Sequence, residues 1–321
     1  MGSYASVART GLGSWSLDVE IEVLRTPEER FASLPDWPYA PAYVDDLAGY
    51  ENLRVHFVDL GPRNAAQTFL CLHGQPSWAF LYRKMIPVFL ESGARVVAPD
   101  FLGFGRSDKP VDDALYTVAF HRNMLLALIR RLDLGQFTLV VQDWGGLIGL
   151  TLPIDVPHQV ARLLIMNTAF PTGAKPGPGF MAWRDYARRN PDLDVGALFA
   201  RGNPSLTPAE AAGYDAPFPD QRFKAGVRRF PELVPVRGEG ADEQVMALGL
   251  AAEAWWSKDF DGPSFMGIGM ADPVLGPDVM ERVRSKIKDC PEPMRLEGVG
   301  HFVQEHGAPL ARAALQAWGD L

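Results

Sequence analysis

Short, continuously apolar segments alternate with helix-patterned segments along most of this 321-residue chain. A strand that is buried on both faces is apolar throughout, which is typical of a parallel sheet. In residues 117–133 apolar side chains recur every four positions, and residues 307–318 repeat this spacing, so both segments predict amphipathic helices. We expect strands at residues 54–58, 68–72, 95–98, 137–141, 162–166, 264–269 and 294–299. Strands that alternate with helices predict a doubly wound α/β sheet.

The alternation stops over residues 170–262, which contain no clear strand, several helix-like pieces and many prolines. The strand pattern returns at residues 264–269, so an insertion explains the interruption better than a separate C-terminal domain does. We therefore expect an α/β core domain over residues 1–169 and 263–321, and an inserted helical cap domain over residues 170–262.

The charge balance is acidic, with 31 lysines and arginines against 39 aspartates and glutamates. The net charge of −8 and the absence of long basic runs argue against nucleic-acid and membrane partners. No segment approaches the about 18 consecutive apolar residues of a membrane span, and residues 1–17 lack the apolar stretch of a signal peptide. Two cysteines, Cys71 and Cys290, are too few for a disulfide scaffold and fit a reducing, cytoplasmic compartment.

The segment Val-Gln-Asp-Trp-Gly-Gly over residues 141–146 ends an apolar run and opens a helix-like pattern. Small residues after a sharp strand-to-helix turn leave the side chain at its apex exposed above the sheet. The apex residue is Asp143, and a carboxylate attacks saturated carbon to form an ester that water can later cleave. The alternative is that Asp143 only caps the following helix.

Two further residues complete a candidate catalytic set. Asp272 follows the expected strand 264–269, and His301 follows the expected strand 294–299. The chain order of nucleophile, acid and histidine is that of α/β-hydrolases. A histidine there can act as general base, and an aspartate can orient it and stabilise the imidazolium. Asp278 is a rival acid, but its place after Pro277 favours a helix start.

The loop His-Gly-Gln-Pro over residues 73–76 follows the expected strand 68–72. In this fold such a loop supplies one backbone N–H of an oxyanion hole, here from Gln75, and Trp144 would supply the other. Two such donors stabilise the charge that develops when an ester carbonyl is attacked. No cluster of cysteines and histidines has the spacing of a zinc site.

With these motifs in place, the chain resembles the haloalkane dehalogenases of the α/β-hydrolase fold, in the subfamily whose acid follows the seventh strand. The resemblance covers residues from about 24 to 318. It is dense in residues 73–87, 98–110, 140–146, 216–220, 275–280 and 300–305. It implies hydrolysis of a small halogenated alkane to an alcohol, a halide ion and a proton, without a cofactor or a metal.

The resemblance also implies residue roles. Asp143 would displace the halide in an SN2 step and form an alkyl ester, and His301, stabilised by Asp272, would activate the hydrolytic water. Indole N–H groups of Trp144 and Trp183 would bind the halide, although a tryptophan in a cap can also be a packing residue. Gln75 stands where relatives often have glutamate, and Asn167 stands where another subfamily carries its acid.

The expected pocket walls are apolar side chains that could equally belong to the core. They are Trp78, Phe101, Phe170, Phe218, Pro219, Val274, Leu275 and Phe302. We further expect a monomer, a cytoplasmic location and a role in detoxification.

The alternative function is that of an epoxide hydrolase, which shares the fold and the Asp–His pair. That chemistry needs acidic phenols in the cap, and Tyr186 and Tyr214 are available. An ester hydrolase is disfavoured because aspartate replaces serine at the apex. A scaffold without activity is disfavoured by the intact set of Asp143, Asp272 and His301.

Overall fold

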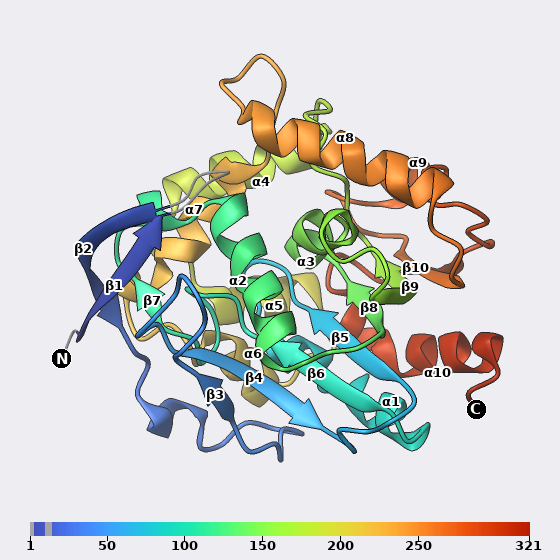
Figure 1. Cartoon of the computed structure of the whole chain (residues 1–321), viewed down its shortest axis with the longest axis horizontal. Coiled ribbons are helices and arrows are strands. Elements are labelled where there is room, and N and C mark those ends of the chain that lie inside the picture. Colours follow the sequence, from blue (N-terminus) through green and yellow to red (C-terminus); the bar gives the residue numbers. More distant parts are fainter. Residues whose placement is uncertain (1–2, 10–14) are drawn as a thin grey trace.

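A mostly parallel sheet of eight strands forms the centre of the molecule (Figure 1). The computed structural model describes residues 3–9 and 15–321, and side chains from residue 21 onward. The sheet order is β11-β10-β9-β8-β5-β6-β4-β3. The strands are β3 (Ala42–Val44), β4 (Val55–Leu60), β5 (Thr68–Leu72), β6 (Arg95–Pro99), β8 (Phe137–Val141), β9 (Val160–Met166), β10 (Ser264–Gly269) and β11 (Met294–Leu296). Within this eight-stranded sheet, the pairs β3–β4 and β4–β6 are antiparallel and the other described pairs are parallel, which confirms the predicted α/β class.

The predicted strands are all present, and β5, β8 and β10 have the predicted bounds. The other four differ by a few residues at their ends, where strands fray. Two features were not predicted. One is β3, which is short and mostly half-buried, so it lacks a continuous apolar run. The other is a separate antiparallel sheet of β1 (Ser3–Arg9), β2 (Trp15–Leu24) and β7 (Lys109–Pro110). The alternation of valine and isoleucine with acidic residues in 18–23 was the available signal for β2.

Four helices between strands are α1 (Ile86–Glu91), α2 (Val118–Arg131), α3 (Asp143–Gly149) and α9 (Pro277–Arg284), and α10 (Gly307–Trp318) follows the last strand. This confirms the two predicted helices, and the Thr117 hydroxyl caps α2 by accepting a hydrogen bond from the backbone N–H of Phe120. α1 packs against α10 and α2 packs against α3. Short 3₁₀ helices are η1 (Glu28–Phe31), η2 (Ala79–Tyr82), η3 (Asp113–Leu115), η4 (Leu152–Ile154), η5 (Gln221–Lys224) and η6 (Val303–His306).

Between β9 and β10 the chain forms helices and loops only. The helices are α4 (Pro178–Arg189), α5 (Val195–Gly202), α6 (Pro208–Asp215), α7 (Ala225–Leu233) and α8 (Glu243–Lys258). Figure 1 shows α4 and α8 along one side of the molecule, with α1 and α10 toward the opposite side. The division of the chain into core and cap domains at residues 170 and 262 stays a prediction. Likewise, part of the N-terminal segment 1–17, where no signal peptide was expected, lies outside the described residues.

None of the described helices is long and apolar enough to cross a membrane.

Candidate active site

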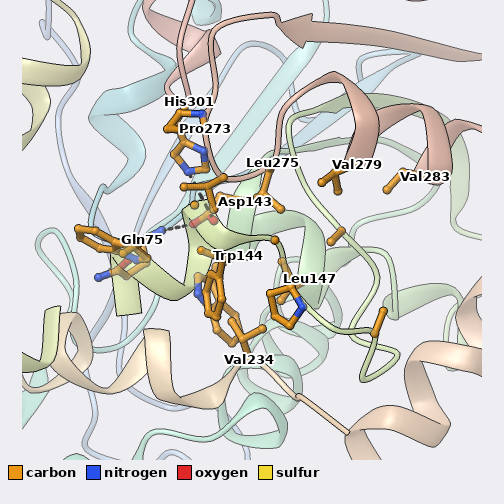
Figure 2. A pocket seen from close by; sticks show the side chains of 18 of the residues that line it. Gln75, Asp143, Trp144, Leu147, Val234, Pro273, Leu275, Val279, Val283 and His301 are labelled. Atoms are coloured by element: carbon orange, nitrogen blue, oxygen red, sulfur yellow. Dashed lines mark hydrogen bonds and ion pairs between the residues drawn. The ribbon is translucent and has the colours of Figure 1, made fainter. Parts of the chain in front are cut away.

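The candidate site lies at the carboxyl edge of the parallel strands. Gln75 follows β5, Asp143 follows β8, Asp272 follows β10 and His301 follows β11. Because parallel strands end at the same edge, these four residues from distant parts of the chain come together there. Figure 2 shows the side chains of Gln75, Asp143 and His301 grouped around one point. β10 is the seventh strand of this sheet in chain order, as the resemblance implied.

Asp143 sits at the apex of a tight turn with a left-handed backbone, at a φ of 48°. Its backbone N–H donates to the carbonyl of Asn167 at 2.8 Å. The turn can pack closely against β5 because glycines follow Trp144: a Cβ on Gly145 would lie 2.0 Å from the Leu72 carbonyl oxygen. The N-cap position of α3 belongs to Gln142, and the Asp143 carboxylate bonds outside its own helix. The helix-cap interpretation of Asp143 is therefore wrong.

His301 lies between two carboxylates. Its Nδ1 is 2.8 Å from Oδ2 of Asp272, and its Nε2 is 3.5 Å from Oδ1 of Asp143. Burial by itself lowers the pKa of His301, but the charges of Asp272 and Asp143 outweigh burial and raise this pKa to about 10. The imidazole can thus exchange a proton on the side that faces Asp143 while Asp272 holds the other nitrogen.

Hydrogen-bond donors surround the buried carboxylate of Asp272 and favour its charged form. Oδ1 accepts hydrogen bonds from the backbone N–H groups of Val274 and Leu275, and Oδ2 accepts one from Asn167 Nδ2 at 3.0 Å. Burial raises the pKa of Asp272, but the charge and hydrogen bond of His301, together with the Val274 and Leu275 N–H groups, reverse the effect and lower this pKa. The rival acid Asp278 lies in the first turn of α9, as its sequence context indicated.

Gln75 contacts the apex carboxylate through its backbone. Its N–H donates to Oδ2 of Asp143 at 2.8 Å, and its side-chain Nε2 donates to the carbonyl of Val227 at 2.9 Å. The backbone N–H of Trp144 lies in the first turn of α3, where helix geometry provides no carbonyl to accept it. The Gln75 N–H therefore contacts the Asp143 carboxylate, and the role of both N–H groups in an oxyanion hole stays a prediction.

Gln142 is a site residue that sequence reasoning missed. Its buried side-chain Nε2 lies 3.1 Å from Nε2 of His301 and donates to the His301 carbonyl at 3.0 Å. The available signal was its position next to Asp143 at the end of β8, where a long amide side chain can reach a neighbouring loop.

The site opens into a cavity of about 930 Å³. Its lining includes Trp144, Trp183 and four of the expected walls: Phe170, Val274, Leu275 and Phe302. Among the described residues, neither the Trp144 nor the Trp183 indole N–H has a protein acceptor. In contrast, the Trp78 and Trp256 indoles donate to backbone carbonyls.

The prediction that the cavity is lined by Trp78, Phe101, Phe218 and Pro219 is wrong. Trp78, Phe101 and Phe218 are fully packed in the core and do not line the cavity. The Trp78 ring packs against Phe31, and its N–H bonds to the Gly213 carbonyl at 3.0 Å. Pro219 is exposed and also lies outside the cavity. Apolar residues next to a motif point into the core as readily as into a pocket, so the motif did not distinguish the two.

The two phenols of the epoxide-hydrolase alternative differ in environment. Tyr186 lines the cavity. Tyr214 is fully buried, and its hydroxyl is held by Arg83 and Glu305. Burial and the neighbouring Glu305 raise the pKa of Tyr214 well above its usual range. Tyr214 is therefore unable to act as an acid toward a substrate in this cavity.

A carboxylate at the apex of a strand-to-helix turn, beside a histidine–aspartate pair at the carboxyl edge of this sheet, defines an α/β hydrolase. The alpha/beta hydrolase fold family matches residues 67–308. A haloalkane dehalogenase of Psychrobacter cryohalolentis K5 is 41% identical over 304 residues, which cover 92% of this chain and 98% of that protein. A haloalkane dehalogenase of Mycobacterium marinum is 40% identical, over 93% of this chain and 100% of that protein.

Solved structures agree with these relatives. The tetrameric structure of haloalkane dehalogenase DpaA from Paraglaciecola agarilytica NO2 matches with a TM-score of 0.90 and 48% identity. The match covers 92% of this chain and 99% of that chain. The chain belongs to the haloalkane dehalogenase family of α/β hydrolases, and it is a hydrolase that acts on carbon–halide bonds.

Proposed function

We propose that Asp143, His301 and Asp272 carry out the hydrolysis of haloalkanes in two steps. The observation that supports this assignment most strongly is the position of His301, with Asp143 at one ring nitrogen and Asp272 at the other. In the first step an Asp143 carboxylate oxygen attacks the halogen-bearing carbon. The carbon–halogen bond breaks, its electron pair leaves with the halide, and an alkyl ester of Asp143 remains.

The second step depends on the charge that the first step removes. Esterification neutralises Asp143 and so takes away one of the two carboxylates that raise the pKa of His301. His301 then releases its extra proton to solvent and accepts one from a water molecule, whose oxygen attacks the ester carbonyl. As the bond between the carbonyl carbon and the alkoxy oxygen breaks, the imidazolium returns this proton to the departing alkoxide. The N–H groups of Gln75 and Trp144 stabilise the oxyanion, Asp272 stabilises the imidazolium, and the alcohol leaves.

The halide site consists of the indole N–H groups of Trp144 and Trp183. An indole N–H is a neutral donor without acceptor capacity, which suits a large anion in an apolar cavity. Both side chains line the cavity, and neither N–H is occupied by a protein acceptor among the described residues. The Gln75 side chain, tied to Val227, takes no direct part in this scheme.

Replacing the general base tests the scheme. We expect His301→Gln to release about one halide per active site and then to stop, because the ester forms but no base activates water. Rapid-quench halide assay with bromohexane, followed by intact-protein mass spectrometry, should show the alkyl group bound to the protein.

The control is Asp143→Ala, which should release no halide and carry no adduct. Continuous turnover by the His301 variant, or a halide burst without an adduct, would contradict the assignment. Diol formation from styrene oxide by the wild-type enzyme, without halide release from bromohexane, would instead favour the epoxide hydrolase.

The proposal extends to the domain division, the cellular location, the biological role and the oligomeric state. We assign residues 170–262 as a cap domain because this all-helical segment interrupts the sheet between β9 and β10. A cytoplasmic location and a role in detoxification stay proposals that rest on the composition and the substrate class. The tetrameric structure of the relative from Paraglaciecola agarilytica argues against the expectation that this protein is a monomer.

A further inference from the structure

The cavity has a larger volume than a small haloalkane requires. Its volume of about 930 Å³ is near the upper end of the range of about 300–1,000 Å³ for small-molecule sites. One wall extends from Leu275 beside Asp272 along α9, through Val279 and Val283 (Figure 2). Because each buried methylene contributes about 0.8 kcal/mol, such a wall favours substrates with a long alkyl chain.

The far end of this wall is basic. Val279, Arg282, Val283 and Lys286 all line the cavity, and their spacing places them on one face of α9 and the turn that follows it. Arg282 and Lys286 are exposed, so they stand where the apolar wall meets solvent. We call these two side chains the basic rim.

The cavity lining as a whole carries more cations than carboxylates. Lys175, Arg201, Arg282 and Lys286 line the cavity, whereas its only carboxylates among the described residues are Asp143 and Glu253. Glu253 already faces Lys286 at 3.6 Å, and no described carboxylate lies within ion-pair distance of Arg282. This excess of cations runs against the net charge of −8 of the whole chain, so it is a local feature of the cavity.

We propose that the enzyme accepts ω-halogenated alkanoates, in which a terminal halogen and a distal carboxylate are separated by an alkyl chain. This inference rests on the proposed function, because the halogen end must reach Asp143. The alkyl chain lies along Leu275, Val279 and Val283, and the carboxylate stays hydrated beside the basic rim. The reaction is the same displacement and ester hydrolysis, and it yields an ω-hydroxyalkanoate, a halide ion and a proton.

The proposal predicts a dependence on chain length. In a short haloalkanoate the carboxylate would have to enter the apolar end of the cavity and approach the Asp143 carboxylate, which like charges oppose. A chain long enough to reach the basic rim escapes this penalty. The preference for the acid over its neutral amide should therefore reverse as the chain lengthens.

The test compares kcat/KM for ω-bromobutanoate, ω-bromooctanoate and their primary amides, with bromohexane as the neutral reference. We expect the octanoate to exceed its amide by roughly threefold to tenfold at low salt, as one or two exposed ion pairs allow. The difference should lie in KM, because a distal contact is the same in the ground and transition states, and it should shrink at high salt. The butanoate should be poorer than its amide.

The variant Arg282→Gln/Lys286→Gln should remove the octanoate preference and leave bromohexane turnover unchanged. The matched control is Arg131→Gln/Arg312→Gln, which makes the same charge change at exposed sites on α2 and α10, outside the cavity lining, and it should keep the preference. Turnover of bromohexane without any preference for the octanoate, or an equal effect of both double variants, overturns the inference alone. Absence of bromohexane turnover overturns the proposed function and this inference with it.

Discussion

At the scale of single residues, the charge of His301 is set by its two carboxylate neighbours. Burial alone would lower the pKa of His301, but Asp272 and the ionised Asp143 raise it to about 10, which favours the imidazolium form. An imidazolium is unable to accept a proton from water. In the reaction we propose, His301 would therefore become an effective base only after Asp143 has been esterified, and this would order the two steps.

The proposed binding of halide by the Trp183 indole N–H can be tested by substitution. We expect Trp183→Phe to weaken bromide binding by roughly tenfold to a hundredfold, because a hydrogen bond to a charged group contributes about 1.5–3 kcal/mol. Quenching of the remaining tryptophan fluorescence by bromide measures the affinity. Trp255→Phe is the control, because Trp255 is likewise half-buried but packs against Trp256 and Phe260, outside this cavity. Equal bromide affinities in both variants would assign the second donor to another residue.

At the scale of elements, the turn between β8 and α3 depends on its glycines. Gly145 lies so close to β5 that a Cβ would be 2.0 Å from the carbonyl oxygen of Leu72, a backbone atom that has no other conformation to adopt. The contact holds the start of α3 against the strand that precedes Gln75. The distance between the apex carboxylate and its N–H donor is thus set by backbone packing.

We expect Gly145→Ala to destabilise the protein by about 1–3 kcal/mol, as overpacking of a dense core does. Urea unfolding followed by circular dichroism measures the change. Gly135→Ala is the matched control, because no atom lies within 4 Å of its added Cβ, and it should leave the unfolding midpoint close to that of the wild type. A Gly145 variant as stable as the control would mean that the turn can shift to admit a methyl group.

At the scale of the whole molecule, one buried ionic cluster joins the inserted helices to the sheet-bearing part. Arg83, which follows η2, makes two hydrogen bonds to Glu305 of η6, at 2.6 and 2.7 Å. The same guanidinium reaches α6 through Glu210 at 2.8 Å and Tyr214 at 3.0 Å. Since Glu305 is four residues after His301, the cluster holds α6 beside the loop that carries His301.

We expect Glu305→Gln to lower the free energy of unfolding by about 3–5 kcal/mol, because it leaves the Arg83 charge buried with one carboxylate fewer. Asp46→Asn breaks an exposed ion pair with Arg131 and serves as the control, with little expected effect. Chemical denaturation compares the two. Similar losses in both variants would show that the cluster adds nothing beyond a surface ion pair.

Local sequence patterns predicted several strands and the residues that follow them. Apolar runs predicted β5, β8 and β10 with their observed bounds, because a strand buried on both faces leaves few polar residues in its sequence. That Asp143, Asp272 and His301 lie together could be predicted because each follows a parallel strand, and parallel strands bring their carboxyl ends to one edge, although β11 before His301 is a half-exposed edge strand.

Other features depended on tertiary contacts. Phe101 and Phe170 are both buried aromatic residues near strand ends, yet only Phe170 lines the cavity. The strand pair of β2 with β7 and the reach of Gln142 to His301 likewise join distant parts of the chain. The sequence by itself therefore determined the order of the elements and the chemistry at the strand ends. The three-dimensional packing decided which apolar side chains face the cavity. The hydrophobic effect is non-directional, so the same apolar residue is favourable beside the core or beside a substrate, and the sequence pattern is the same in both cases.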